Sequence, residues 1–205
     1  MCNRYQPTRF NERIRMIFEN APDGWLAEAD HKYDTVYPKS NVPVVLNVNG
    51  EKMFKNFRWG IHPSWAKSPG QILTNSKSEE VFTKPTWKES FERRRCVMPA
   101  DSFYEPATVD GKKHQVRFQL KSGAPFVFAA LWEKDHAAQV NSCSLLTCEP
   151  NEIVGEVHNR MPVLLPTELI DFYLSVPPTE VRDLRDILRP WPAEDMTAAF
   201  DSTST

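Results

Sequence analysis

Four extended, apolar segments follow one another between residues 95 and 148, and they constrain the fold more than any other feature. They read CVMPADSFYE, HQVRFQL, FVFAALWE and SCSLLTC, and Asp110-Gly111 is a typical turn pair between the first two. No regular alternation of strands and helices interrupts them, so a parallel sheet is disfavoured. We therefore expect an α+β fold with an antiparallel core.

The regions around this core predict a further hairpin and several short helices. In VPVVLNV-NG-EKMFKNFRW, residues 42–59, Asn49-Gly50 favours a type I′ turn between two strands. Apolar residues recur at helical spacing over 8–20, with Thr8 as the candidate N-cap. The other expected helices are 79–94 (interrupted at Pro85), 151–159, 167–176 and 178–188, and residues 196–205 are expected to form an edge strand or a frayed tail.

Composition narrows the class of protein. A chain of 205 residues suits one domain, which we place at 1–195, and a net charge of −2 gives no general attraction to nucleic acid. The four cysteines form no CxxC pair, so neither a zinc site nor a disulfide framework is expected, and Cys96 and Cys143 read as buried. Without an apolar membrane-length segment, we expect a cytoplasmic protein without a cofactor.

The second residue raises a chemical question. If Met1 is trimmed, Cys2 carries a free α-amine and a thiol on adjacent carbons. An α-amine has a reference pKa of about 7.7–8.0, so a useful fraction is unprotonated near neutrality and can attack a carbonyl. The alternative is that this cysteine is incidental, as most short motif matches are.

Three further groups of polar residues interrupt apolar sequence. They contain Asn75 with Lys77 and Glu79, then Glu105, and then His158 with Arg160. Each has a purely structural alternative: Asn75 caps a helix, Glu105 faces solvent at a strand end, and His158 complements a helix C-terminus. Together with Cys2, however, a carboxamide, a carboxylate and an imidazole supply what an amine needs to attack a carbonyl.

These groups resemble the motifs of the SOS-response-associated peptidase (SRAP) family of abasic-site processing proteins. The family's opening Met-Cys-Gly-Arg-Phe is similar to MCNRY here. Further matches follow in order along the chain: WGIHPSW (59–65), NSKSE (75–79), RCVMPADSFYEP (95–106), FAALWE (128–133) and HNRMP (158–162).

The resemblance implies a single compact α+β domain with an antiparallel, barrel-like core that crosslinks to abasic sites in single-stranded DNA. It implies that Cys2 is the nucleophile, that Asn75 holds the N-terminus and the sugar, that Glu105 is the acid/base and that His158 assists opening of the deoxyribose. It further implies that Arg4, Lys77 and Arg160 hold phosphates.

Partners beyond these motifs follow from charge and aromatic residues. Lys84 with Lys88, Arg93 and Arg94 is expected to form a basic stripe, and Trp65 and Phe82 are expected to stack on bases. The alternative is that the arginine run at 93–95 is a solvated helix end. We expect a monomer, located with the nucleoid if the source is bacterial.

Five positions depart from the family's pattern. Asn3 and Ser102 replace glycines, Lys77 replaces an arginine, Pro106 replaces a tryptophan and Asn159 replaces an aspartate. Lysine keeps the charge but loses the planar group that pairs with phosphate, and the lost tryptophan removes a stacking surface. The four expected catalytic residues are intact.

Two other functions remain open on the sequence. One is a thiol peptidase in which Cys2 is an N-terminal nucleophile. The other is a non-covalent binder of single-stranded or modified DNA, in which Cys2 plays no part. A lyase side reaction is compatible with the crosslinking function, because the imine that precedes ring closure also permits β-elimination.

Overall fold

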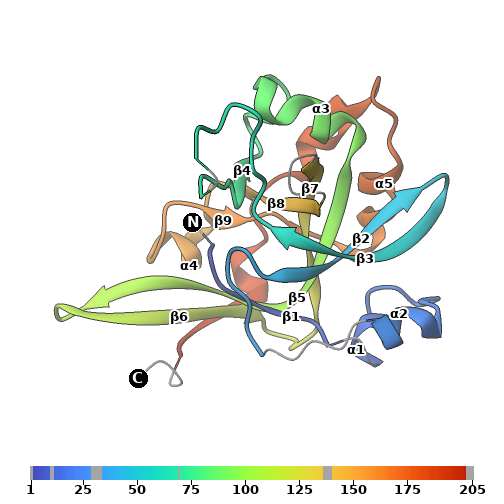
Figure 1. The fold of residues 1–205 in the computed structure, drawn as a ribbon. Helices are drawn as coiled ribbons and strands as arrows, with labels where there is room; N and C mark the ends of the chain where they lie inside the picture. Colours follow the sequence, from blue (N-terminus) through green and yellow to red (C-terminus); the bar gives the residue numbers. More distant parts are fainter. Residues whose placement is uncertain (1, 10–11, 29–33, 69, 136–139, 202–205) are drawn as a thin grey trace.

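A closed ring of five strands forms the centre of the fold. The computed structural model describes residues 2–9, 12–28, 34–68, 70–135 and 140–201. Within them the ring consists of β2 (Asn41–Val48), β3 (Glu51–Trp59), β8 (Val140–Cys148), β7 (Phe126–Asp135) and β5 (Arg95–Val109), and β5 returns to pair with β2 (Figure 1). The expected α+β fold with a barrel-like core is confirmed.

Four of the five pairings in the ring are antiparallel, and the fifth is not. Strand β3 runs parallel to β8, with Trp59 opposite Cys143. A second parallel pairing on the same side of β8 comes from β4 (Asn75–Lys77). The sequence predicted neither parallel pairing. Strand β4 itself was not predicted, because it has only three residues and no apolar run of its own.

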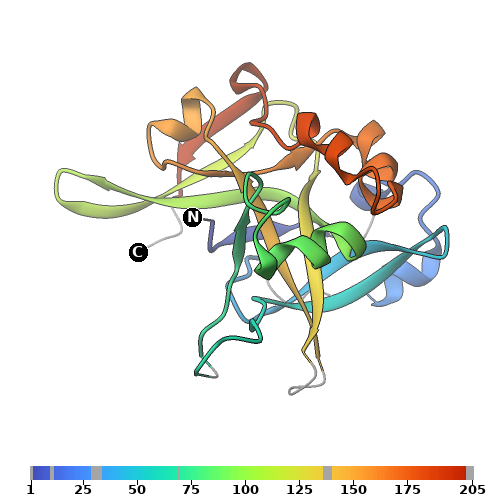
Figure 2. The same cartoon turned by 90° about the horizontal axis from the view of Figure 1, so that it is seen from above.

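Further strands extend the ring on several sides. They are β1 (Tyr5–Pro7) on β5, β6 (Lys112–Leu120) on β5, β9 (Met161–Pro162) on β8, β10 (Leu164–Leu165) on β7 and β11 (Met196–Phe200) on β6. The β5–β6 hairpin projects beyond the barrel, and the N-terminal segment lies along it in both views (Figures 1 and 2). Of the 196–205 segment, residues 196–200 thus form an edge strand, and 202–205 lie outside the described residues.

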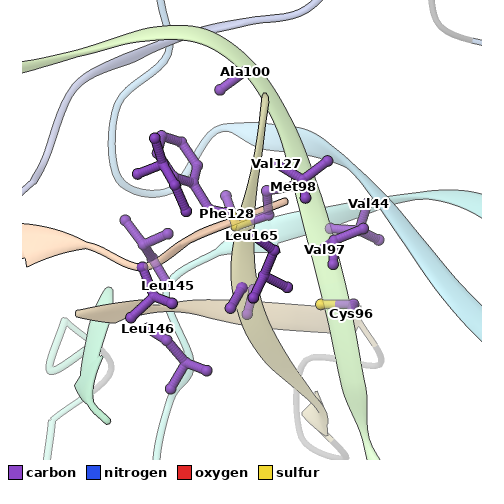
Figure 3. Close-up of a cluster of buried hydrophobic side chains, with 14 of the residues drawn as sticks. Val44, Cys96, Val97, Met98, Ala100, Val127, Phe128, Leu145, Leu146 and Leu165 are labelled. Atoms are coloured by element: carbon purple, nitrogen blue, oxygen red, sulfur yellow. The ribbon is translucent and has the colours of Figure 1, made fainter. Parts of the chain in front are cut away.

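Apolar side chains from the ring strands fill its interior. Val97 and Met98 of β5, Phe128 of β7 and Leu145 of β8 are each fully buried and lie close together in Figure 3. Cys96, from the same cluster, is buried as predicted, and so is Cys143. Burial of so much apolar surface holds the strand ends in fixed positions, and the candidate site is built on those ends.

The helices are shorter than predicted. The α-helices are α1 (Glu12–Arg15), α2 (Asp23–Glu28), α3 (Pro85–Arg93), α4 (Glu152–Gly155) and α5 (Ile170–Ser175), and the 3₁₀ segments are Thr167–Leu169, Val181–Ile187 and Ala193–Asp195. Within the described part of the chain, no helix is long and apolar enough to cross a membrane.

Three of the helix predictions need correction. The helix expected over 8–20 is a single turn, and Thr8 is not its cap because its hydroxyl lies 3.1 Å from Asp101 Oδ1. Pro85 does not interrupt a helix but begins α3. Proline is tolerated there because an N–H at the first helical position would have no partner within the helix. The helix expected over 178–188 is a 3₁₀ segment.

The hairpin prediction for 42–59 is confirmed in both strand bounds and turn. Strands β2 and β3 pair in continuous antiparallel register from Val48 opposite Glu51 to Asn41 opposite Arg58. Asn49 and Gly50 both have positive φ, 54° and 92°, as a type I′ turn requires.

Candidate functional site

Cys2 is buried and lies three residues before strand β1. The backbone N–H of Tyr104 in β5 donates to the carbonyl of Arg4 at 3.0 Å, which fixes the N-terminal segment against the start of the β5–β6 hairpin. Only 1% of Cys2 is exposed, and its Sγ lies 3.5 Å from the Arg4 carbonyl oxygen. The second residue is therefore part of the packed structure.

Asn75 holds the backbone of Cys2. Its Nδ2 donates to the Cys2 carbonyl at 3.1 Å and to Thr74 Oγ1 at 2.9 Å. Its Oδ1 is buried and accepts no hydrogen bond from any described residue. Because Asn75 lies in strand β4, the helix-cap alternative is wrong, and its buried acceptor is available to a ligand.

Glu105 is a buried carboxyl group in β5. None of its surface is exposed, so the alternative of a solvated strand end is wrong. Burial raises the pKa of Glu105 to about 7. Burial, and after it the charge of Glu105, raises the pKa of the Cys2 thiol well above its usual range. The carboxyl group thus lies close enough for its charge to affect the ionisation of the thiol.

His158 follows α4 by three residues and lies before β9. Its backbone N–H donates to Val154 at 2.9 Å, and its Nδ1 lies 3.0 Å from the backbone N and 3.2 Å from the carbonyl oxygen of Arg160. Because a backbone N–H can only donate, the shorter contact makes Nδ1 the acceptor, and the neutral ring then carries its proton on Nε2. Burial lowers the pKa of His158, so the imidazole is mainly neutral near pH 7.

Strand β8 brings the segments of Asn75 and His158 together. At its end, Thr147 lies opposite Lys77 of β4 on one side and opposite Pro162 of β9 on the other. The structure therefore joins Asn75 to Cys2 by a hydrogen bond, places the Glu105 carboxyl group where its charge acts on Cys2, and places the His158 segment at the same end of the barrel as Asn75. Among the described residues, no three His, Cys, Asp or Glu side chains are placed to hold a metal ion.

Four of the cations expected to contact DNA, the three expected phosphate-binding residues and Lys84 of the basic stripe, all have acidic partners. Arg4 pairs with Asp201 at 2.8 Å and lies 4.2 Å over the Tyr104 ring. Arg160 makes a two-pronged ion pair with Glu79. Lys84 pairs with Glu80 at 2.8 Å, and Lys77 lies 3.9 Å from the same carboxylate. Both lysines keep about half of their side-chain surface exposed, so they remain accessible to DNA.

The two aromatic residues expected to stack on bases differ in exposure. Trp65 is 53% exposed, and its Nε1 donates to Thr86 at 3.2 Å. The Phe82 ring packs edge-to-face on Phe91, with the guanidinium of Arg185 at 4.8 Å from its centre. Trp65 thus presents a ring to solvent, whereas Phe82 is partly buried.

The predicted basic stripe is largely neutralised within α3. Arg94 pairs with Glu89 at 2.9 Å, and Lys88 lies 4.0 Å from Glu92. Arg95 is not part of a solvated helix end, because it is buried and donates to backbone carbonyls such as those of Phe91 and Tyr173.

Sequence reasoning missed two residues at the site. Thr74 accepts from Asn75 and donates to Asn3 Oδ1 at 3.1 Å, so it joins the N-terminus to β4. Asp201 reaches Arg4 from the far end of the chain through β11. Thr74 could have been found from its position next to Asn75, but no local pattern in the sequence marks Asp201.

Comparisons with known proteins agree along nearly the whole chain. A family model described as SOS response associated peptidase (SRAP) matches residues 1–203. Abasic site processing protein YoqW of Bacillus subtilis (strain 168) is 35% identical over 205 residues, covering 97% of this chain and 91% of that protein. Abasic site processing protein HMCES of Gallus gallus is 27% identical over 221 residues, covering 88% and 64%.

A solved structure shows the same fold. A crystal structure of a protein from Bordetella bronchiseptica superposes with a TM-score of 0.82 at 26% identity, covering 98% of this chain and all of that one. The match of the family model over nearly every residue, together with these relatives, places this chain in the SOS response associated peptidase (SRAP) family.

Proposed function

We propose that this protein acts in the response to DNA damage by capturing abasic sites in single-stranded DNA as a covalent thiazolidine on Cys2. The relatives named as abasic site processing proteins support the substrate class. The hydrogen bond from Asn75 to Cys2, beside the buried Glu105 carboxyl group, is the observation that carries the proposal.

The first step joins the amine to the sugar. After removal of Met1, the unprotonated α-amine of Cys2 attacks the C1′ aldehyde of the ring-opened deoxyribose and gives a carbinolamine. Glu105 takes a proton from the attacking nitrogen and returns it to the departing hydroxyl, so that one water leaves and an imine remains. A carboxyl group with a pKa of about 7 suits both roles, because both of its forms are populated near neutrality.

The second step closes the ring. The Cys2 thiol adds across the imine: sulfur bonds to carbon, and the thiol proton ends on nitrogen. The overall change is aldehyde plus aminothiol to thiazolidine plus one water. Burial keeps this thiol protonated, so Glu105 as a carboxylate is the nearby base that assists its addition.

Asn75 and His158 assist at the sugar. The buried Oδ1 of Asn75 is a hydrogen-bond acceptor for a sugar hydroxyl, while its Nδ2 keeps Cys2 in place. The Nε2–H of His158 is a donor to the ring oxygen of the closed deoxyribose, which must take up a proton when the sugar opens. Holding the reacting groups next to one another contributes to the rate through effective concentration.

Binding of DNA before capture is expected to be weak and dependent on salt. Lys77 and Lys84 are exposed cations near β4, and Trp65 offers a ring on which a base can stack. With a net charge of −2, few phosphates are neutralised, and the covalent step supplies the durability. We expect the protein to act as a monomer.

A denaturing gel tests the proposal. Mature protein is incubated with a labelled single-stranded oligonucleotide that carries one abasic site. Wild type and the thiol control Cys96→Ala, which alters a buried cysteine of β5, should both give a shifted band, and Cys2→Ala should give none. The absence of a band with wild type, or an equal band with Cys2→Ala, would rule the proposal out.

A peptidase function is the second candidate, because the family's description names one. The environment of Cys2 argues against it. A peptidase needs a thiolate for its first attack, whereas burial and then the charge of Glu105 raise the pKa of the Cys2 thiol; in capture the amine attacks first, and the thiol adds only to the imine already formed. Repeated turnover of a peptide substrate by purified protein would favour the peptidase, and nicking of abasic DNA would indicate β-elimination from the imine.

A further inference from the structure

We propose that Glu79 is a positioning residue for His158 and that it acts through Arg160. The inference rests on the proposed function for the role of His158 in capture. Glu79 does not itself contact the reacting groups in this proposal. It holds the segment that carries one of them.

The first link is the ion pair between Glu79 and Arg160. The Arg160 Nη1 donates to Glu79 Oε1 at 2.6 Å, and Nη2 donates to Oε2 at 2.8 Å. The same Nη2 donates to the carbonyl of Thr147 at 2.6 Å. Two-pronged, charge-assisted pairs of this kind are strong and fix orientation, and the Arg160 side chain is only 13% exposed.

The second link runs from Arg160 to His158 along the backbone. Residues 158–160 lie between α4 and the two-residue strand β9 and belong to neither. The Arg160 N–H donates to His158 Nδ1 at 3.0 Å, and the Arg160 carbonyl oxygen lies 3.2 Å from the same nitrogen; the shorter contact with the N–H favours the Nε2–H form of the ring. On its C-terminal side this short segment is restrained by β9 and by the Arg160 side chain.

The third link joins the two halves of the site. Glu79 lies in the turn directly after β4, the strand that carries Asn75. Thr147, the other partner of Arg160, pairs with β4 and β9 at the end of β8. The Arg160 guanidinium therefore ties the Asn75 segment, β8 and the His158 segment to one another.

This arrangement differs from the phosphate-binding role that the family resemblance implies for Arg160. Both terminal nitrogens of the guanidinium already donate to Glu79 and Thr147. A phosphate would have to share the Arg160 guanidinium with the Glu79 carboxylate. The Arg160 guanidinium holds the pKa of Glu79 below its usual range, so the pair stays ionised at neutral pH.

Nitrogen-15 NMR of the histidine rings without DNA tests the positioning role. The variant is Glu79→Gln, and the matched control is Glu80→Gln, which changes the next carboxylate, a partner of Lys77 and Lys84. In wild type and in Glu80→Gln, His158 should show an unprotonated Nδ1 and a protonated Nε2. In Glu79→Gln the two shifts should move toward each other as the tautomers exchange. Unchanged shifts in Glu79→Gln would overturn the inference.

A kinetic arm separates positioning from phosphate binding. At saturating abasic DNA, Glu79→Gln should lower the capture rate by about tenfold or more, with the affinity for undamaged single strands unchanged. A wild-type capture rate with tighter DNA binding would mean that Glu79 only competes with phosphate for Arg160. If wild type itself captures no DNA, the proposed function fails, and the NMR result still decides the role of Glu79.

Discussion

At the scale of single residues, the site depends on polar groups placed where water is excluded. Asn75 and Glu105 are ordinary residues by type, and the sequence allowed a cap or a solvated strand end for them. The structure buries the carboxyl group of Glu105 completely and the amide oxygen of Asn75. Burial of a polar group costs free energy when hydrogen bonds do not compensate for the loss of water. Burial also raises the pKa of a carboxyl group toward neutrality.

Replacement of Glu105 by glutamine should change how stability depends on pH. The pKa of Glu105 is about 7 in the folded protein and near 4.5 in the unfolded chain, so the folded state holds the proton more tightly. Wild-type stability should therefore fall as pH rises from about 4.5 to about 7, and Glu105→Gln should lack this fall. The variant should gain on the order of 2 kcal/mol relative to wild type between pH 5 and pH 8.

Urea unfolding at a series of pH values measures this difference. The control is Glu51→Gln, which changes an exposed carboxylate of β3 and should leave the pH dependence of wild type intact. A constant stability difference between Glu105→Gln and wild type from pH 5 to pH 8 would show that Glu105 is not buried as a titrating group.

At the scale of elements, local signals predicted what they directly encode and little more. Asn49-Gly50 specified a hairpin, since both positions need positive φ and few other pairs accept it. The apolar residues over 8–20 include Ile14, Ile17 and Phe18, which are buried, but their spacing overstated the length of the helix. In that region tertiary contacts, such as Thr8 with Asp101, outweigh helix propensity.

The turn after β3 gives a test at this scale. Gly60, in the Trp-Gly motif, has φ of +122°, and a Cβ there would lie 2.7 Å from Ile72 Cδ1 and 3.3 Å from its Cβ. Gly60→Ala should therefore destabilise the protein by about 2 kcal/mol. Gly24→Ala, in α2, meets no atom within 4 Å and should be neutral or slightly stabilising. Thermal unfolding of both variants measures this difference in stability, and equal melting temperatures would contradict the expected strain at Gly60.

At the scale of the whole molecule, the barrel places residues that are distant in sequence at one end. Asn75 reaches Cys2 across 73 positions, and Asp201 reaches Arg4 from the position after the last described strand. The α+β class followed from the order of strands, but the parallel pairing of β4 with β8 did not, because no local pattern encodes a partner so far away. The site residues were found by their resemblance to a family, whereas their acidic partners Glu79, Glu80 and Asp201 required the structure.

The intact mass of mature protein mixed with single-stranded DNA carrying one abasic site tests the central claim most directly. The account predicts one species at the mass of protein plus DNA minus one water, formed without a reducing agent. Cys2→Ser keeps the amine but lacks the thiol, so it should give a stable adduct only when borohydride reduces the imine. A wild-type adduct that also needs borohydride, or one that retains the water, would contradict ring closure by the Cys2 thiol.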